Sequence, residues 1–301
     1  MIRRLDASTE RFLTTLEAQA RRTERAQRQL ASGKRLLSPS DDPDNVRSLM
    51  RLRTELSRVE QIKIDLGRVQ AEVDTAEQGL QQAVRVMERA EVLAAAGVTG
   101  TATEQQRKIL AEEVKALLVE MVSISQLAIE GRYVFSGDAD NVAPFQLDWS
   151  QPDPVSGYLG GPATRQAMHP AGPTFAIAKS GEEIFDHPDP DKNVFDALNE
   201  LRLALEANDE EAIRQVIPRL RTAAQHLNVQ LAFYGTVRNA VDAARNFADQ
   251  QILQFKTRLS EIEDADAVEA ILELNASRYQ QEVGLATKAR TRELSLFDFL
   301  A

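Results

Sequence analysis

Two rows of apolar residues at heptad spacing constrain the fold of this chain more than any other feature. The first row is Leu52, Val59, Leu66, Val73, Leu80, Met87 and Ala94, and the second is Ile213, Leu220, Leu227, Tyr234, Val241, Ala248, Phe255 and Ile262. An apolar side chain at every seventh residue marks one face of a long α-helix that packs against a partner helix. The sequence therefore predicts two long helices, one in each half of the chain.

Shorter helical patterns lie between and beyond these rows. Apolar residues at Leu110, Leu117 and Ile124 predict a helix to about residue 130, after "AGVTGT" has interrupted the first long helix. A helix is expected again at "NVFDALNELRLALEA", and the second long helix starts after "NDEE". Pro218 lies early in that helix, where we expect a bend or a first-turn position. A final amphipathic segment follows "EDADAVEA".

The middle of the chain has a different character. Eight of the eleven prolines lie from Pro144 to Pro190, together with the only tryptophan and two of the three histidines. Within this stretch, "TFAIAKSGEEIF" is typical of a strand, a glycine turn and a second strand. We expect a small β-containing insertion between the helices.

The order of these segments is nearly a mirror image about the insertion. We therefore expect a mainly α fold, an elongated antiparallel helical bundle or coiled coil formed by both chain ends, with the β-containing insertion at its distal tip. The expected domains are terminal helices at 1–40 plus 262–301, a helical rod at 41–143 plus 191–261, and the insertion at 144–190.

The two terminal segments have thinner apolar stripes and opposite charge. Residues 1–40 contain nine Lys/Arg and four Asp/Glu, whereas residues 260–301 contain four Lys/Arg and nine Asp/Glu. Opposite charge favours pairing of the two helices with each other or with like neighbours. Isolated helices of this quality are marginal in water. We expect both segments to be disordered or mobile in the monomer and to become ordered in an assembly.

Composition excludes several classes of function. The net charge of −10 argues against a general affinity for nucleic acid or anionic lipid. The absence of cysteine excludes disulfides, zinc–thiolate sites and cysteine nucleophiles. No apolar run is long enough to span a membrane. The N-terminus lacks the apolar region of a secretory signal, so we expect any export to occur without a cleavable signal peptide.

The stretch "LASGKRLLSPSDDPDN" could be a phosphate-binding loop or a corner between helices. A phosphate loop requires an upstream glycine, a preceding strand and a Ser/Thr after the lysine, and none of these is present. The corner interpretation is stronger: Gly33 ends one helix, Pro39 prevents its continuation, and Asp42 and Pro43 start the next. Nearby aspartates lack the spacing of a calcium-binding loop, which again favours helix capping.

No other residues form a recognisable catalytic or metal-binding pattern. His169, His187 and His226 have no histidine partner at a metal-ligand spacing, and no serine lies in a G-x-S-x-G setting. We expect no cofactor, no metal and no enzymatic activity.

Four stretches carry a resemblance to a known family. They are "LASGKRLLSPSDDPDN", "DTAEQGLQQAVRVMERAEVLAAAG", "LSEIEDADAVEA" and "LSLFDFLA". Together they resemble the flagellin and hook-associated protein family, the building blocks of the bacterial flagellum. The likeness covers roughly residues 1–145 and 190–301. "GRYVFSGDADNVAPF" and the short insertion resemble the members that join hook to filament.

The resemblance implies a structural adaptor exported unfolded by the flagellar type III apparatus to the hook–filament junction outside the cell. Its implied partners are an adjacent hook-associated protein, flagellin, an export chaperone and further copies of itself in a ring. The residues that it implies for assembly and chaperone binding are Leu5, Phe12, Leu16, Leu30, Leu285, Leu294, Leu296, Phe297, Phe299 and Leu300. The alternatives are a filament-forming flagellin and, more distantly, a secreted helical effector with a site in the insertion.

Overall fold

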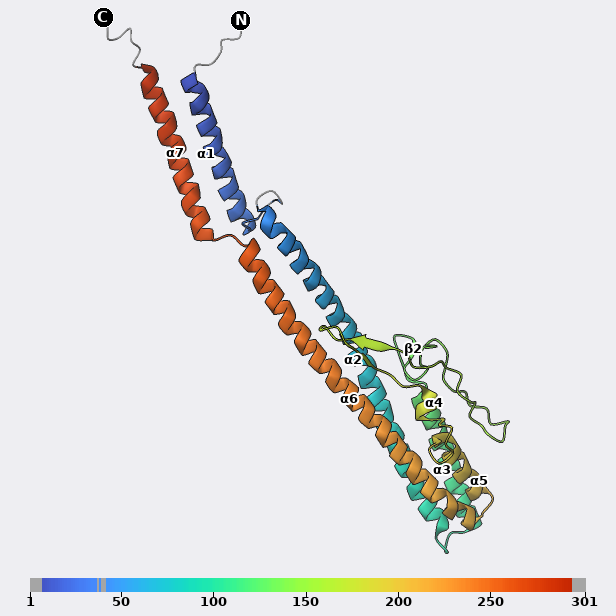
Figure 1. Ribbon diagram of the computed structural model, residues 1–301. Helices are drawn as coiled ribbons and strands as arrows, with labels where there is room; N and C mark the ends of the chain where they lie inside the picture. Colours follow the sequence, from blue (N-terminus) through green and yellow to red (C-terminus); the bar gives the residue numbers. More distant parts are fainter. Residues whose placement is uncertain (1–6, 37, 39–41, 294–301) are drawn as a thin grey trace, which may run out of the picture. The chain divides into compact units, whose positions relative to one another are not determined.

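The computed structural model describes residues 7–36, 38 and 42–293 (Figure 1). Contacts divide the chain into two compact units, Met1–Arg58 with Gln251–Ala301, and Val59–Gln250. The long helices α2 (Pro43–Val98) and α6 (Glu210–Glu263) each contribute to both units. They carry the two heptad rows, which confirms the prediction of one long helix in each half of the chain.

The first unit contains the helices closest to the chain ends. Helices α1 (Ala7–Ser32) and α7 (Ala267–Glu293) lie side by side, with the start of α2 and the end of α6 adjoining them in the sequence (Figure 1). The two helices run antiparallel, because Thr23 contacts Ser277 whereas Gly33 contacts Ala265 further along α1. This pairing confirms one of the two arrangements that the opposite charges of the terminal segments favour.

The second unit consists mainly of helices packed on a shared core. Helices α3 (Glu104–Ser125) and α5 (Val194–Glu206) pack against each other. A capping box starts α3, in which the side chains of Thr103 and Gln106 satisfy each other's backbone N–H groups. The Asn193 side chain accepts hydrogen bonds from the backbone of Phe195 and Asp196 and so starts α5.

Strands occupy little of the described chain. Strands β1 (Ala128–Ile129) and β2 (Arg132–Tyr133) form one antiparallel hairpin. Strands β3 (Gln166–Met168) and β4 (Thr174–Ala176) form another, with Ala167 opposite Phe175. The predicted mainly α class with a small β-containing insertion is therefore confirmed.

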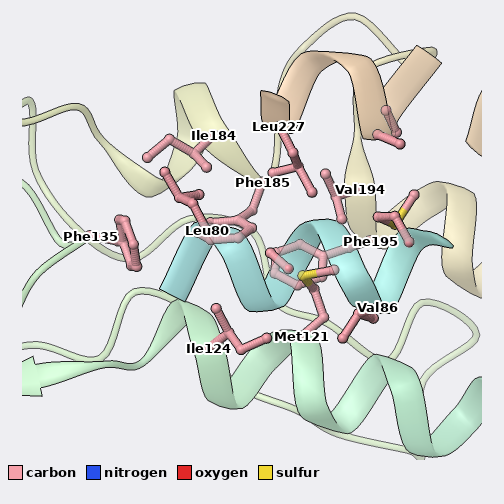
Figure 2. Close-up of a cluster of buried hydrophobic side chains, with 14 of the residues drawn as sticks. Leu80, Val86, Met121, Ile124, Phe135, Ile184, Phe185, Val194, Phe195 and Leu227 are labelled. Atoms are coloured by element: carbon pink, nitrogen blue, oxygen red, sulfur yellow. The ribbon is translucent and has the colours of Figure 1, made fainter. Parts of the chain in front are cut away.

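The core of the second unit combines the heptad rows with aromatic side chains from the insertion and from the segments on either side of it. Figure 2 shows Phe135, Phe185 and Phe195 beside Leu80 of α2 and Met121 of α3. The ring centroids of Phe135 and Phe185 lie 5.3 Å apart in an edge-to-face arrangement, which aromatic pairs prefer. Every member of the first row from Val59 to Ala94 is buried.

Two local predictions are wrong. The expected second strand of the insertion is instead the short helix α4 (Gly181–Ile184), because the Ser180 side chain accepts a hydrogen bond from the Glu183 backbone and caps it. Helix α3 ends at Ser125 rather than near residue 130. Pro218 lies inside α6, beyond its first turn, which excludes the first-turn position and leaves the bend as the prediction for this residue; buried Ile213 and Leu220 hold the helix on the core at either side.

Candidate assembly surface

Small side chains occupy the fully buried positions of the contact between α1 and α7. Ala26 of α1 is buried, as are Ala270 and Ser277 of α7. The hydroxyl groups of Thr23 and Ser277 form a hydrogen bond of 2.9 Å across the two helices. Small residues let two helices approach closely but bury little apolar area, so the pair gains only modest hydrophobic stabilisation.

Large apolar side chains of α7 remain exposed to solvent. Val268 is 68% exposed, Leu272 64% and Tyr279 69%. The same helix also exposes Ile271, Val283 and Leu285. Several exposed apolar residues on one helix indicate a surface that contacts another protein. Residues Val268, Ile271, Leu272, Tyr279, Val283 and Leu285 are called the α7 apolar surface below.

A groove of about 560 Å³ runs between α1 and α7. Arg22 and Arg25 line it from α1, and Glu269 and Glu273 line it from α7. The groove therefore has a basic wall and an acidic wall. Side chains of opposite charge on its two walls can guide the register of a charged partner helix.

The predicted corner lies at the end of α1. Gly33 has a φ of +70° and its N–H donates to the Gln29 carbonyl at 2.8 Å, as expected of a glycine that ends a helix. Asp42 caps α2, because its carboxylate accepts from the N–H of Asn45 at 3.2 Å, and Pro43 is the first residue of that helix. Hydrogen bonds from the Asn45 side chain and backbone hold the pKa of Asp42 below its usual value.

A second corner, between α6 and α7, is joined to the first by the backbone. Lys34 and Asp264 form an antiparallel β-bridge. The Arg35 N–H donates to the Glu263 carbonyl at 2.7 Å, and the Ala265 N–H donates to the Gly33 carbonyl at 2.9 Å. Residues 33–35 and 262–265 are called the corner contact below. It connects the segment that follows α1 to the segment that precedes α7.

Comparison with known proteins identifies the family. The model of the bacterial flagellin N-terminal helical region matches residues 6–140, and the model of the flagellin C-terminal helical region matches residues 217–300. Together the two models span more than half of the chain. This chain belongs to the bacterial flagellin family.

Several individual flagellar proteins are similar to this chain over most of its length. The chain is 24% identical over 260 residues to the flagellar hook-associated protein 3 of Escherichia coli (strain K12), covering 79% of this chain and 80% of that protein. A flagellar hook-associated protein of Vibrio parahaemolyticus has a similar fold, with a TM-score of 0.66 and 19% identity over 74% of this chain and all of that one. The flagellar junction protein FlgL of Legionella pneumophila has a TM-score of 0.55 and 13% identity, over 65% and 99% of the two chains.

The site residues implied by the flagellin-family resemblance fall into two groups. Phe12, Leu16 and Leu30 are half-buried on α1, and Leu285 is exposed on α7. Phe12 lies at the contact with α7, where the Lys288 ammonium is 5.7 Å from its ring centroid. The remaining implied residues lie outside the described part of the chain, as does Pro39 of the predicted corner: Leu5, Leu294, Leu296, Phe297, Phe299 and Leu300.

Sequence reasoning missed the residue at the centre of the corner contact, Glu263. Its side chain is only 10% exposed, and one of its oxygens lies 2.5 Å from both the Lys34 ammonium and the Arg53 guanidinium. Burial raises the pKa of this carboxyl, but the hydrogen bond from Lys34 and the charge of Arg53 outweigh it and hold the pKa below its usual value. The sequence indicates this role of Glu263 only in part, because the acidic stretch "EIED" could equally mark the start of a helix.

The histidines form no metal centre. Among the described residues, no group of three or more His, Asp or Glu side chains could hold a metal ion. His169 packs its ring 5.1 Å from that of Phe247, while His187 and His226 lie 5.1 Å apart in an edge-to-face arrangement. Of the described helices, none is long and apolar enough to cross a membrane.

Proposed function

We propose that this chain is a structural adaptor of the bacterial flagellum that joins the hook to the filament. The observation that carries the proposal is the alignment with a protein named flagellar hook-associated protein 3, which extends over 79% of this chain and 80% of that protein. An alignment of this length extends over most of both proteins. The similar folds of hook-associated proteins support the same proposal.

The paired terminal helices are the proposed assembly elements. The α7 apolar surface exposes several large apolar side chains on one helix, as interaction surfaces do. A neighbouring axial protein would bury them. The groove beside it, with its basic and acidic walls, would fix the register of that neighbour. Adjacent hook-associated protein, flagellin and further copies of this chain in a ring are the proposed neighbours. The adaptor acts without catalysis.

Export in an unfolded state, without a cleavable signal peptide, and capture by a chaperone complete the proposal. An amphipathic helix that binds in a chaperone groove would keep its apolar face covered until assembly. The segment 262–301 contains the α7 apolar surface and is the proposed chaperone-binding element. Deletion of this segment should abolish chaperone binding in a pull-down with the purified proteins. Undiminished binding by the truncated chain would refute the assignment.

A chromosomal deletion of the corresponding gene tests the main proposal. We expect the deletion strain to assemble hooks, to lack filaments, and to release flagellin into the medium. Electron microscopy of isolated hooks and immunoblotting of the medium measure the two effects. Complementation with the full chain should restore filaments. Normal filaments on the deletion strain would exclude the junction role.

A filament-forming flagellin is the second candidate, since the two matching family models are named for flagellin regions. The two functions differ in self-assembly. A filament-forming flagellin elongates filaments from seeds of its own kind, whereas an adaptor does not grow beyond its own layer. Light scattering of the purified chain, with and without sheared filament seeds, separates them. Continued elongation would favour the flagellin function.

A further inference from the structure

The corner contact brings together parts of the chain that are far apart in sequence. Lys34 and Glu263 are separated by 229 positions, and Arg53 and Glu263 by 210. The backbone hydrogen bonds of Gly33 and Arg35 align the two segments, and the Arg35 guanidinium adds a bond of 2.9 Å to the Ile262 carbonyl. The end of α1 and the start of α7 are therefore fixed to the same point.

The charges at this point are organised around one carboxylate. Glu263 accepts from a cation on the segment after α1 and from a cation on α2. The other charged groups nearby have separate partners: Arg35 lies 3.9 Å from Asp42, and Ser260 donates to Asp264. Removing the charge of Glu263 would leave Lys34 and Arg53 without their shared anion, and such a loss weakens a partly buried ionic contact considerably.

The start of α7 depends on the residues that follow Glu263. The Asp266 carboxylate accepts from the N–H groups of Val268 at 2.8 Å and Glu269 at 3.3 Å, and so caps the helix. Only Asp264 and Ala265 separate this cap from Glu263, and both participate in the bridge to Gly33 and Lys34. Displacement of Glu263 therefore displaces the first turn of α7.

The α1–α7 contact itself is thin, because Ala26, Ala270 and Ser277 bury little apolar area. We propose that Glu263 is a conformational latch, which couples the two corners so that α1 and α7 dock and separate as one unit. The latch acts on the terminal pair independently of the partner that this pair contacts. It goes beyond the proposed adaptor function, and either can fail without the other.

Disulfide trapping across the helix pair tests the latch. The chain has no cysteine, so the double substitution T23C/S277C introduces the only two thiols, at positions whose hydroxyl oxygens lie 2.9 Å apart. Thr23 lies about 15 Å along α1 from Gly33, at ~1.5 Å per residue. A change in disulfide formation at position 23 therefore reports the docking of α1 on α7, and not merely a local loss of structure at the corner contact. The equilibrium between dithiol and disulfide in a glutathione buffer gives the effective concentration of one thiol at the other.

We expect E263Q to lower this effective concentration about tenfold, the effect of losing one hydrogen bond to a charged group. The matched control is E261Q. It neutralises an exposed carboxylate two positions before Glu263 and should leave the effective concentration unchanged. Salt at 1 M should lower the value for the parent pair and have little effect on E263Q. The K34M/R53M double variant should lower the effective concentration as much as E263Q does. Adding E263Q to K34M/R53M should lower it no further.

Equal effective concentrations in the parent, E263Q and E261Q chains would overturn the proposal. Absence of the disulfide in the parent pair would also overturn it, because there would be no docked pair for Glu263 to hold. The folding control is the urea unfolding transition of the second unit, residues 59–250, measured in the full chain. If E263Q changed that transition as strongly as it changed trapping, the effect would be general destabilisation and the latch would be rejected.

Discussion

The hydroxyl oxygens of Thr23 and Ser277 lie 2.9 Å apart, although 254 positions separate the two residues in the sequence. One hydroxyl donates to the other, and the accepting hydroxyl donates to a carbonyl of its own helix, either Thr23 to Gln19 or Ser277 to Leu274. This polar contact at the centre of an interface of small side chains means that the fit of the helices, more than buried apolar area, holds α1 on α7. Four predictions follow from this and other contacts.

Enlarging Ser277 should separate the terminal helices. This side chain is 2% exposed and faces Thr23, so Ser277→Leu overpacks the contact, which costs about 1–3 kcal/mol. In a complemented deletion strain we expect S277L to reduce swimming and the fraction of hooks that carry filaments. Ser277→Ala keeps the small volume and should restore both. Wild-type filaments with S277L would show that close approach of α1 and α7 is not required.

Arg107 should be a major stabilising residue of the second unit. Its side chain is 9% exposed and donates to the Gly97 carbonyl at 2.8 Å and to the Asn208 side chain at 2.7 Å. It therefore ties the end of α2 to the turn between α5 and α6. Arg107→Met should lower the free energy of unfolding by about 3 kcal/mol, because the buried Gly97 carbonyl and the Asn208 side chain lose their donor.

Urea denaturation measures this change, and Arg85→Met is the control. Arg85 is exposed on α2, so its replacement should change the free energy of unfolding by less than about 0.5 kcal/mol. Equal effects of the two substitutions would mean that the buried hydrogen bonds of Arg107 contribute nothing net.

Gly137 should not tolerate a side chain. Its φ is +60°, and an added Cβ would lie 2.2 Å from the Gly161 carbonyl oxygen and 2.7 Å from that of Pro162. Gly137→Ala should destabilise the second unit by about 3 kcal/mol or more, since both the backbone and the neighbouring chain must move. Calorimetry should show a Tm lower by about 6–12 °C for a unit of this size.

Gly157 offers the matched control for this substitution. It lies in the insertion, in the same compact unit as Gly137, is exposed, and has nothing within 4 Å of an added Cβ. Gly157→Ala should leave Tm unchanged or raise it slightly. A similar loss at both positions would show that the loss of glycine flexibility, and not the lack of space around Gly137, causes the destabilisation.

Stability should fall at mildly acidic pH because of His226. Burial lowers the pKa of this residue, despite the bond between its ring and the Glu183 carbonyl at 2.8 Å, which acts in the opposite direction. The unfolded chain then binds a proton at about pH 6.5 and the folded chain only at a lower pH. Stability is therefore fully present above about pH 6.5 and declines as the pH falls toward the folded-state pKa.

Urea unfolding between pH 7.5 and 5.5 measures this dependence. His226→Gln removes the titrating group and should flatten the decline, since Gln can still donate to the carbonyl. His187, whose ring lies 5.1 Å away, adds like-charge repulsion when both rings are protonated. A decline of the same slope in H226Q would assign the pH dependence to other groups.

Local and periodic features of the fold were predictable from the sequence. The burial of Val59, Leu66 and Val73 follows from heptad spacing, which depends only on the helical repeat. Gly33 and Asp42 were correctly assigned because helix ends have short-range signals in glycine and capping carboxylates. The short helix α4 was missed although Ser180 and Glu183 form an S-x-x-E pattern, which is a helix-start signal within an apparently β-rich stretch.

The candidate surface was predictable only as a region. Opposite charge at the two ends favoured the α1–α7 pairing, but charge alone specifies neither register nor partner residues. Glu263 is one of 46 acidic residues, and no local pattern distinguishes it from those that remain solvated. Its role arises from Lys34 and Arg53, which only the folded chain brings to it.

The bridge between Lys34 and Asp264 closes a loop that contains about three quarters of the 301 residues. Loop closure costs entropy that grows with length, so this bridge forms late compared with the contacts between neighbouring helices. During synthesis the first helix must remain without its partner until almost all of the chain has been made. The corner contact therefore makes the placement of α1 depend on the synthesis of residues 262–265.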